Sequence, residues 1–408
     1  MEVMLADMVF ALSDAVDLVG VDDDLHGKRV AVMAAECGRE LGYDDDHCAR
    51  LLHAGMLHDC GVSSTRVHQH LVGEFDWVGS QAHCVLGARL LADVPALTRL
   101  APVVRWHHTH WSAMPADLDP EVARDANLIF LVDRVDALTA PFYGAPDYLM
   151  RKEDGCRTIA ANAGGRFCPE LVDAFMAASR REAFWLYLER RYLWRYLHDV
   201  AKRGLATDID LAGLRQFALM FAQIIDAKSP FTTEHSLGVA RLALHLARHL
   251  RLDASTCARI EIAALLHDVG KLRVPDAVLE KPAPLEPGER AAMLRHSFET
   301  YQILHWIGGM EEIALWAASH HEKLDGSGYP FHLAAGQLPL PARIIAVADV
   351  CQALVQNRPY RAPMPDDAVL AELRRLIAAG LLDREVVACL EADLAASMAV
   401  ARGEGAAT

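Results

Sequence analysis

The stretch HHEKLDGSGYP, residues 320–330, joins two adjacent histidines to a tight glycine-rich turn that carries an acid. Few purely structural roles require that combination. The pair His267-Asp268 lies upstream of this stretch and Asp349 lies downstream of it, so imidazoles and carboxylates recur within one window of the chain. These side chains are ligands for divalent transition metals. The stretch therefore predicts a metal site assembled from several segments.

The composition limits the class of protein. The 408 residues are enough for two domains, and a hydrophobic content of 52% can fill two cores. A formal net charge of −15 argues against a protein that coats a nucleic acid polymer or an anionic membrane. The 9 cysteines form no CxxC pair and are expected to be reduced core residues. Because no apolar run could span a membrane and no basic signal region begins the chain, we expect a cytoplasmic location.

The chain also repeats itself. His26 precedes the pair His58-Asp59 by 32 residues, and His235 precedes the pair His267-Asp268 by the same 32 residues. The two halves are thus offset by 209 residues, and the later positions keep the same residue types with small length changes. The first set is His26, His58, Asp59, His83, His107, His108 and Asp133, and the second set is His235, His267, Asp268, His296, His320, His321 and Asp349.

Both halves have a helical pattern. Apolar residues recur at spacings of three and four, as in Ile260, Ala263 and Ala264, and strand-like alternation is scarce. The predicted fold class is all-α, with two tandem helical bundle domains. We expect the first domain at residues 1–180, an aromatic-rich helical connector at 181–210, and the second domain at 211–408.

The second set of seven ligands predicts a reaction type. Seven ligands are too many for one ion of this kind, but two ions could share them if Asp268 bridged the ions through its two carboxylate oxygens. Such a pair keeps open positions for water and for phosphate oxygens, which is the arrangement used for in-line attack on phosphorus. The second half is therefore expected to hydrolyse a phosphodiester.

The second half resembles the HD-GYP family, a branch of the HD metal-dependent phosphohydrolases. The resemblance covers about residues 211–400 and is carried by the sequence HDVGK at 267–271 and by the stretch at 320–330. The segments 229–236 and 358–361 are also similar to that family. The resemblance implies that both domains have an HD-type helical fold, and that the first domain is a divergent HD repeat.

The same resemblance implies an activity. Family members hydrolyse cyclic di-GMP to the linear dinucleotide pGpG and often further to GMP, with two divalent ions, chiefly iron or manganese. A hydroxide activated by both ions would be the nucleophile. Phe231 stands where some members have a glutamate that binds a third ion, which favours two ions here. The implied ligands are His235, His267, Asp268 and Asp349 for one ion, and Asp268, His296, His320 and His321 for the other.

Several residues are candidates for contact with the substrate. Besides Asp268, the predicted catalytic residue is Lys271, which is placed one turn beyond the His-Asp pair to neutralise the scissile phosphate. Tyr329 is expected to shape the turn over the pocket. The candidate substrate-binding residues are Tyr329, Arg343, Arg358 and Arg361.

The first half keeps the ligands but changes what surrounds them. Val62 stands where Lys271 stands in the second half, Asn127 replaces Arg343, and no acidic glycine turn follows His107-His108. Several buried ionisable groups without an ion would be costly, so the seven ligands predict a second metal site in the first domain. Hydrolysis of the same substrate is not expected there.

Two alternatives stay open. The same chemistry could act on another cyclic dinucleotide, such as cyclic GMP-AMP, because the choice between guanine and adenine depends on the shape of the pocket. The chain could instead be a nonhydrolytic receptor or scaffold that binds the dinucleotide or a GGDEF-type cyclase as a signalling partner. The intact Lys271 and the complete ligand set count against a receptor.

Overall fold

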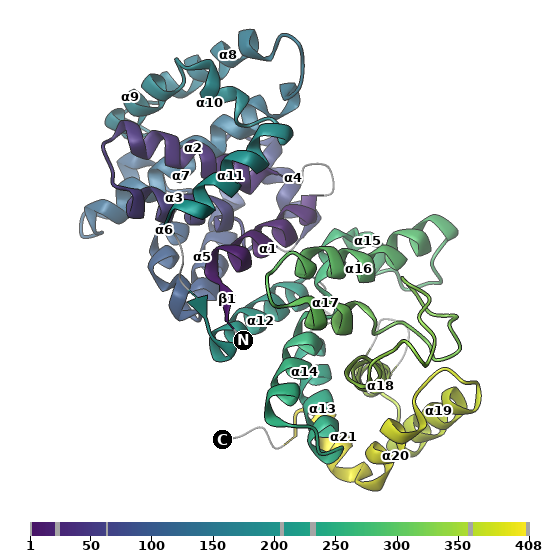
Figure 1. Ribbon diagram of the computed structural model, residues 1–408. Coiled ribbons are helices and arrows are strands. Elements are labelled where there is room, and N and C mark those ends of the chain that lie inside the picture. The colour runs from purple at the N-terminus through teal and green to yellow at the C-terminus, as the bar shows by residue number, and fades with distance from the viewer. Residues whose placement is uncertain are drawn as a thin grey trace. The chain divides into compact units, whose positions relative to one another are not determined.

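Figure 1 shows the computed structural model, which describes residues 2–20, 25–62, 64–204, 208–228, 234–357 and 362–404. Helices make up almost all of its regular structure. Within these residues there is one sheet of two short strands, β1 (Val3–Met4) and β2 (Asp208–Ile209). The predicted all-α fold class is confirmed. No helix of the described residues is long and apolar enough to cross a membrane.

The chain divides into two compact units, and the division falls between Asp208 and Ile209. The first unit is residues 4–208, and the second is residues 209–408 together with residues 1–3. The segment that we expected to connect two domains forms α10 (Glu182–Leu186) and α11 (Arg190–Gly204), which belong to the first unit.

The first unit is a bundle in which α2 packs against α3, α7 and α9. Its core contains fully buried side chains such as Met33, Leu51 and Phe130. Besides α10 and α11, its helices are, in chain order, α1 (Leu5–Asp17), α2 (His26–Glu40), α3 (Asp45–Leu57), α4 (Thr65–Gly73), α5 (Gln81–Ala92), α6 (Ala101–Trp106), α7 (Pro120–Thr139), α8 (Tyr148–Ala160) and α9 (Pro169–Ala178).

The second unit is a bundle in which α13 packs against α14 and α18, and α16 packs against α17. Its helices, in chain order, are α12 (Leu211–Ala227), α13 (His235–His249), α14 (Ala254–Leu266), α15 (Asp276–Leu279), α16 (Pro287–His305), α17 (Glu311–Ala318), α18 (Leu340–Val355), α19 (Asp366–Ala378), α20 (Arg384–Ala392) and α21 (Leu394–Arg402).

Equivalent capping residues begin the two helices that lead to the His-Asp pairs. Asp44 accepts a hydrogen bond from the backbone of His47 at 2.8 Å, and Asp253 accepts one from the backbone of Thr256 at 3.0 Å. An aspartate at this position satisfies a backbone N–H that the first turn leaves unpaired. Helices α3 and α14 therefore start at matching places, and each runs for 13 residues up to its His-Asp pair.

A glycine after each pair lets the chain pass close to the next ligand-bearing helix. A Cβ atom on Gly61 would lie 2.1 Å from the carbonyl oxygen of His83, and one on Gly270 would lie 2.0 Å from that of His296. Neither position could hold a side chain without moving backbone. This approach brings the His-Asp pair next to the following histidine in each unit.

Candidate metal centre

The second unit brings its seven predicted ligands together from five segments. His235 begins α13, the pair His267-Asp268 follows α14, and Asp349 lies on α18. The remaining histidines are His296 on α16 and the pair His320-His321 after α17. Six of the seven residues are buried, whereas the side chain of His321 is 27% exposed.

Asp268 lies at the middle of this group, with imidazoles on both of its oxygens. Its Oδ2 atom is 3.2 Å from Nε2 of His267 and 3.9 Å from Nε2 of His235. Its Oδ1 atom is 3.6 Å from Nε2 of both His296 and His320. This division of the two oxygens is what a carboxylate that bridges two ions requires.

Asp349 and His321 complete the two halves of the group. Oδ1 of Asp349 lies 3.3 Å from Nε2 of His235, and its Oδ2 lies 4.0 Å from Nδ1 of His321. The histidines and carboxylates gather into two sets that could each hold an ion, one with His235, His267 and Asp268 and one with His296, His320 and His321.

Backbone carbonyls orient three of the imidazoles. In His267, His296 and His320, the Nδ1 atom donates a hydrogen bond to a carbonyl oxygen three residues earlier. A carbonyl only accepts, so each Nδ1 carries the proton and each Nε2 directs its lone pair towards the centre. The acceptors are Ala264 at 2.7 Å, Met293 at 2.6 Å and Ala317 at 2.7 Å.

The group fits divalent metal ions on its own geometry. Nε2 of His267 and Oδ1 of Asp268 are buried, and neither has a hydrogen-bond partner within the described part of the chain. Buried polar atoms without partners are costly, and two cations, one on each side of Asp268, would satisfy both atoms. Imidazole with carboxylate suits iron, manganese, nickel and zinc alike, so the donor set accepts two divalent ions without choosing between these metals.

The pKa shifts of Asp268, His296 and His321 agree with this use. Burial alone would raise the pKa of Asp268, but the neighbouring His267 and Lys271 hold the pKa of this carboxyl well below its usual value. Burial lowers the pKa of His296 to about 4 and that of His321 to about 3. The carboxylate is therefore charged and these imidazoles are neutral at pH 7, which are the metal-binding forms.

Two of the predicted substrate-side residues lie at the centre. Nζ of Lys271 is 2.5 Å from Oδ2 of Asp268, and the lysine side chain is 17% exposed. The Tyr329 ring lies 4.9 Å from the His321 ring, centroid to centroid, beside the exposed edge of the group. A positive charge and an aromatic ring therefore stand where the centre meets solvent.

Arg343 is used inside the protein. Its guanidinium donates to the carbonyl oxygens of Leu338 at 2.8 Å and Ala335 at 2.5 Å, and to Oδ2 of Asp383 at 3.1 Å. These bonds tie the start of α18 to the loops around it, and a substrate contact by Arg343 stays a prediction. Arg358, Arg361 and Phe231 lie outside the described residues.

The acidic glycine turn is held by its own side chains. Glu322 accepts hydrogen bonds from the backbone of Phe331 at 2.6 Å and of Leu333 at 3.0 Å, and Asp325 accepts one from the backbone of Ser327 at 2.9 Å. These bonds fold the segment that carries Tyr329 back towards His321.

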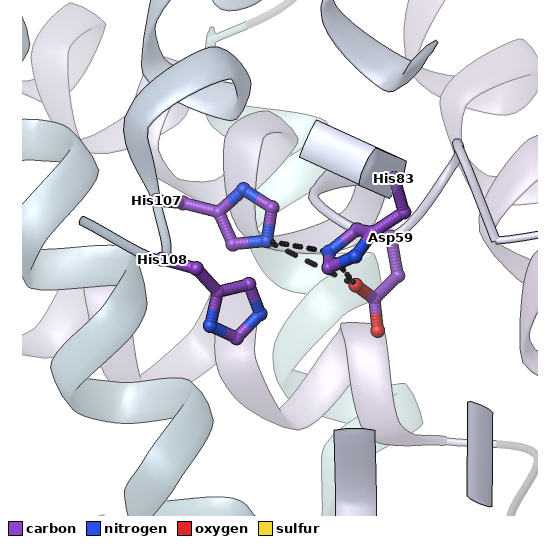
Figure 2. A group of neighbouring side chains, drawn as sticks. All are labelled: Asp59, His83, His107 and His108. Carbon is purple, nitrogen blue, oxygen red and sulfur yellow. Dashed lines mark hydrogen bonds and ion pairs between the residues drawn. The ribbon is translucent and has the colours of Figure 1, made fainter. Parts of the chain in front are cut away.

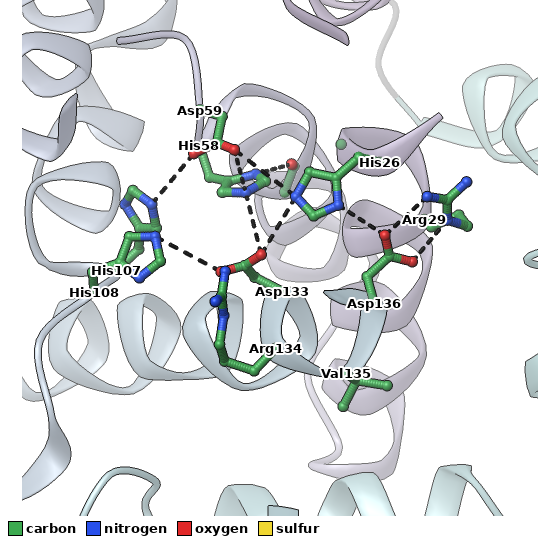
Figure 3. Close-up of polar contacts among 12 residues, drawn as sticks. His26, Arg29, His58, Asp59, His107, His108, Asp133, Arg134, Val135 and Asp136 are labelled. Atoms are coloured by element: carbon green, nitrogen blue, oxygen red, sulfur yellow. Dashed lines mark hydrogen bonds and ion pairs between the residues drawn. The ribbon is translucent and has the colours of Figure 1, made fainter. Parts of the chain in front are cut away.

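The first unit builds a matching group around Asp59. Figure 2 shows His83, His107 and His108 gathered beside this carboxylate. Oδ1 of Asp59 lies 3.2 Å from Nε2 of His83 and 3.9 Å from Nε2 of His107. Its Oδ2 faces the other way, 3.4 Å from Nε2 of His58 and 3.8 Å from that of His26 (Figure 3). Asp59 thus has imidazoles on both of its oxygens, as Asp268 has.

Asp133 lies between His26 and His108 in the first group, as Asp349 lies between His235 and His321 in the second. Its Oδ1 lies 3.4 Å from Nε2 of His26, and its Oδ2 lies 3.8 Å from Nε2 of His108. Nδ1 of His58 and of His107 each lie close to a carbonyl oxygen three residues earlier, at 2.8 and 2.7 Å. All seven predicted positions of the first half therefore meet in one place.

The sequence patterns missed the residues that support these ligands. Nδ1 of His235 lies 2.9 Å from Oε1 of Gln356, and Nδ1 of His26 lies 2.8 Å from Oδ2 of Asp136. Arg134 donates to Oδ2 of Asp133 at 2.8 Å. Gln356 and Asp136 lie one or two turns after the aspartate ligand, and that spacing along a helix is the signal that could have found them.

Comparison with known proteins agrees with this geometry. HD domain family models match residues 24–140 and 219–386. Over 390 residues the chain is 35% identical to 3'3'-cGAMP-specific phosphodiesterase 1 of Vibrio cholerae, with 94% of this chain and 90% of that protein covered. The chain belongs to the HD-GYP family of HD phosphohydrolases. Its two units carry one HD domain each, as the sequence resemblance implied.

Other relatives of this HD-GYP protein match it over different shares of its length. 3'3'-cGAMP-specific phosphodiesterase 3 of Vibrio cholerae is 33% identical over 71% of this chain and 62% of its own length. The cyclic di-GMP phosphodiesterase response regulator RpfG of Xanthomonas campestris is 39% identical over 39% of this chain and 43% of its own length. A crystal structure of a cyclic GMP-AMP specific phosphodiesterase of Vibrio cholerae superimposes with a TM-score of 0.66 at 25% identity, covering 97% of this chain and 98% of that one.

Proposed function

We propose that this protein is a metal-dependent phosphodiesterase for cyclic dinucleotides, and that its second HD domain carries out the hydrolysis. The observation that carries this proposal is the position of Asp268, with imidazoles on both oxygens and the Lys271 ammonium at 2.5 Å from one of them. Two divalent ions, for which we propose iron or manganese, would supply an activated water and would offset the charge of the phosphate.

The residues of this domain have separate tasks. The buried imidazoles and carboxylates would hold the ions, and Asp268 would contribute one oxygen to each. Lys271 keeps a positive charge at the edge of the centre, where it stabilises the negative charge that grows on a phosphate oxygen during attack. Tyr329, folded against His321, forms one wall of the entrance. The oxygen of water bonds to phosphorus, one P–O ester bond breaks, and the leaving oxygen takes up a proton to become a hydroxyl, so the ring opens to a linear dinucleotide.

We propose 3'3'-cGAMP as the preferred substrate and cyclic di-GMP as the second candidate. The relative that aligns over 94% of this chain is cGAMP-specific, whereas the cyclic di-GMP phosphodiesterase of Xanthomonas campestris aligns over only 39% of it. The resemblance of the second half to the HD-GYP family implied cyclic di-GMP, whereas the relative that aligns over nearly the whole chain favours 3'3'-cGAMP. A GGDEF-type signalling partner and a cytoplasmic location stay predictions.

Hydrolysis by anaerobically purified protein tests this proposal. The protein would be supplied with ferrous or manganous ion and given 3'3'-cGAMP or cyclic di-GMP, with the products separated by chromatography. We expect faster hydrolysis of 3'3'-cGAMP, and loss of hydrolysis in Asp268→Ala. Faster hydrolysis of cyclic di-GMP would reverse the order of the substrates. If the metal-loaded protein bound a dinucleotide but left both intact, the nonhydrolytic receptor would replace the enzyme.

A further inference from the structure

We propose that the first HD domain holds two divalent ions in a closed centre that a dinucleotide does not enter, so that these ions stabilise the domain instead of hydrolysing substrate. This inference goes beyond the proposed function and does not depend on it. It is based on three observations in the first unit. Buried ligand atoms have no hydrogen-bond partner, two buried side chains cover the His108–Asp133 side of the centre, and a charged carboxylate binds one of the ligand histidines from outside.

The first observation is that the ligand atoms of the first unit need a cation. Nε2 of His58 and Oδ1 of Asp59 are buried, and within the part of the chain that the structure describes neither atom has a hydrogen-bond partner. The side chains of Asp59 and Asp133 are 10% and 2% exposed, so two carboxylates are held largely away from water. Without ions, this arrangement would oppose folding of the domain.

The second observation is that the entrance differs between the two units. In the second unit the two predicted ligands with the largest side-chain exposure are His321 at 27% and Asp349 at 12%. Their counterparts in the first unit, His108 and Asp133, are 5% and 2% exposed. The side of the first centre that His108 and Asp133 form is therefore less exposed than the matching side of the second centre.

Two residues on α7 provide this cover. Phe130, one turn before Asp133, packs edge-on against His108 with ring centroids 5.2 Å apart. Arg134 directly follows Asp133, and Figure 3 shows the two side chains together. The Arg134 guanidinium donates to Oδ2 of Asp133 and to the carbonyl oxygen of Glu74, each at 2.8 Å. Phe130 and Arg134 are 1% and 2% exposed, so they form part of the interior.

The second unit has small or neutral residues at the same two places. Ala346 stands one turn before Asp349 and Val350 directly follows it. Alanine cannot cover a neighbouring histidine, and valine cannot bind the aspartate oxygen. The same two positions of the repeat therefore separate an open centre from a closed one.

The third observation is the outer layer of the first centre. Oδ2 of Asp136 accepts from His26, and the same carboxylate accepts from Nε and Nη2 of Arg29 at 2.7 and 2.9 Å. Asp136 is fully buried. An outer carboxylate makes an imidazole a stronger ligand and fixes its orientation. The matching outer partner in the second unit is a neutral amide, Gln356.

Metal content of the full-length protein tests the inference without any substrate. Asp268→Ala removes the bridging ligand of the second domain, and Asp59→Ala removes that of the first, so each variant reports on the other domain. We expect elemental analysis to find two ions per chain in Asp268→Ala, held by the first domain. A chelator should remove these ions at least about tenfold more slowly than it removes the ions that Asp59→Ala holds in its second domain. The wild-type protein should then release its metal in two phases of equal size.

The cover is tested on the Asp268→Ala background. Phe130→Ala and Arg134→Val, which copy the second unit, should speed release of the remaining metal by about tenfold or more. Arg124→Val is the matched control, because Arg124 lies on the same helix but forms an exposed ion pair with Glu170. Circular dichroism confirms that each variant is folded.

Three results would overturn the inference. Asp268→Ala protein without bound metal would mean that the first domain holds no ions. Release as fast as that from Asp59→Ala would mean that the centre is open. If either variant does not fold, metal release from the wild-type protein still tests the inference. Two phases of release would support a closed first centre, and a single fast phase would count against it.

Discussion

Alanine at position 328 would test how closely the glycine turn must approach the backbone that follows the two histidines. A Cβ atom on Gly328 would lie 2.4 Å from Cα of Glu322 and 2.4 Å from the backbone nitrogen of Lys323. Ordinary van der Waals contact begins at 3.4 Å. Both neighbours are backbone atoms that cannot rotate away, so the turn has to move by roughly 1 Å.

This shift has two expected consequences. Overpacking of this kind costs about 1–3 kcal/mol of stability. Tyr329 is the next residue and packs against His321, so the wall of the entrance moves with the turn. A displacement of about 1 Å in groups that position a substrate can lower the rate by about 100-fold. We therefore expect kcat/KM for the dinucleotide to fall by about 100-fold while the metal content stays unchanged.

Urea unfolding, elemental analysis and initial-rate kinetics would measure these effects. Gly336→Ala is the matched control, since a Cβ atom there meets no described atom within 4 Å. We expect the control to change stability by less than about 0.5 kcal/mol and to keep the wild-type rate. Wild-type kinetics in Gly328→Ala, or an equal loss in Gly336→Ala, would refute the argument from close approach.

Three further changes have expected outcomes. Lys271→Met should lower kcat by about 10²–10³-fold without loss of metal, because it removes a charge that acts on the developing phosphate oxygen; an unchanged kcat would exclude that role. Asp136→Ala should weaken metal binding in the first domain by about 10–100-fold, measured by titration of Asp268→Ala protein, and equal affinity would mean that the outer carboxylate is unimportant. Burial lowers the pKa of His53 to about 4, so between pH 6.5 and 4 the unfolded state takes up the proton first and stability declines as the pH falls. His53→Leu should remove about 2 kcal/mol of the loss between pH 7 and pH 5 in urea unfolding, and an identical loss in both proteins would contradict the shift.

Much of the site was predictable from the sequence because the two halves of the chain repeat the same histidines and aspartates and can be compared with each other. An offset of 209 residues, with small length changes between the later positions, brings each of the seven histidines and aspartates of one half onto the same residue type in the other half. Ligand identity is a property of side-chain chemistry, so Asp268 and Asp59 could be named before any contact was known. Lys271 followed from its place one turn beyond the His-Asp pair.

The sequence alone therefore determined the all-α class and the two HD repeats, and it named the fourteen residues predicted as ligands, because helical periodicity and side-chain chemistry are local properties. Only the tertiary structure decided that imidazoles lie on both oxygens of Asp268, and that Arg343 is bonded to its own loops. It also decided that Phe130 and Arg134 cover the first centre while Ala346 and Val350 do not cover the second. Burial and partner choice depend on which helices pack together, and a list of residues does not contain that information.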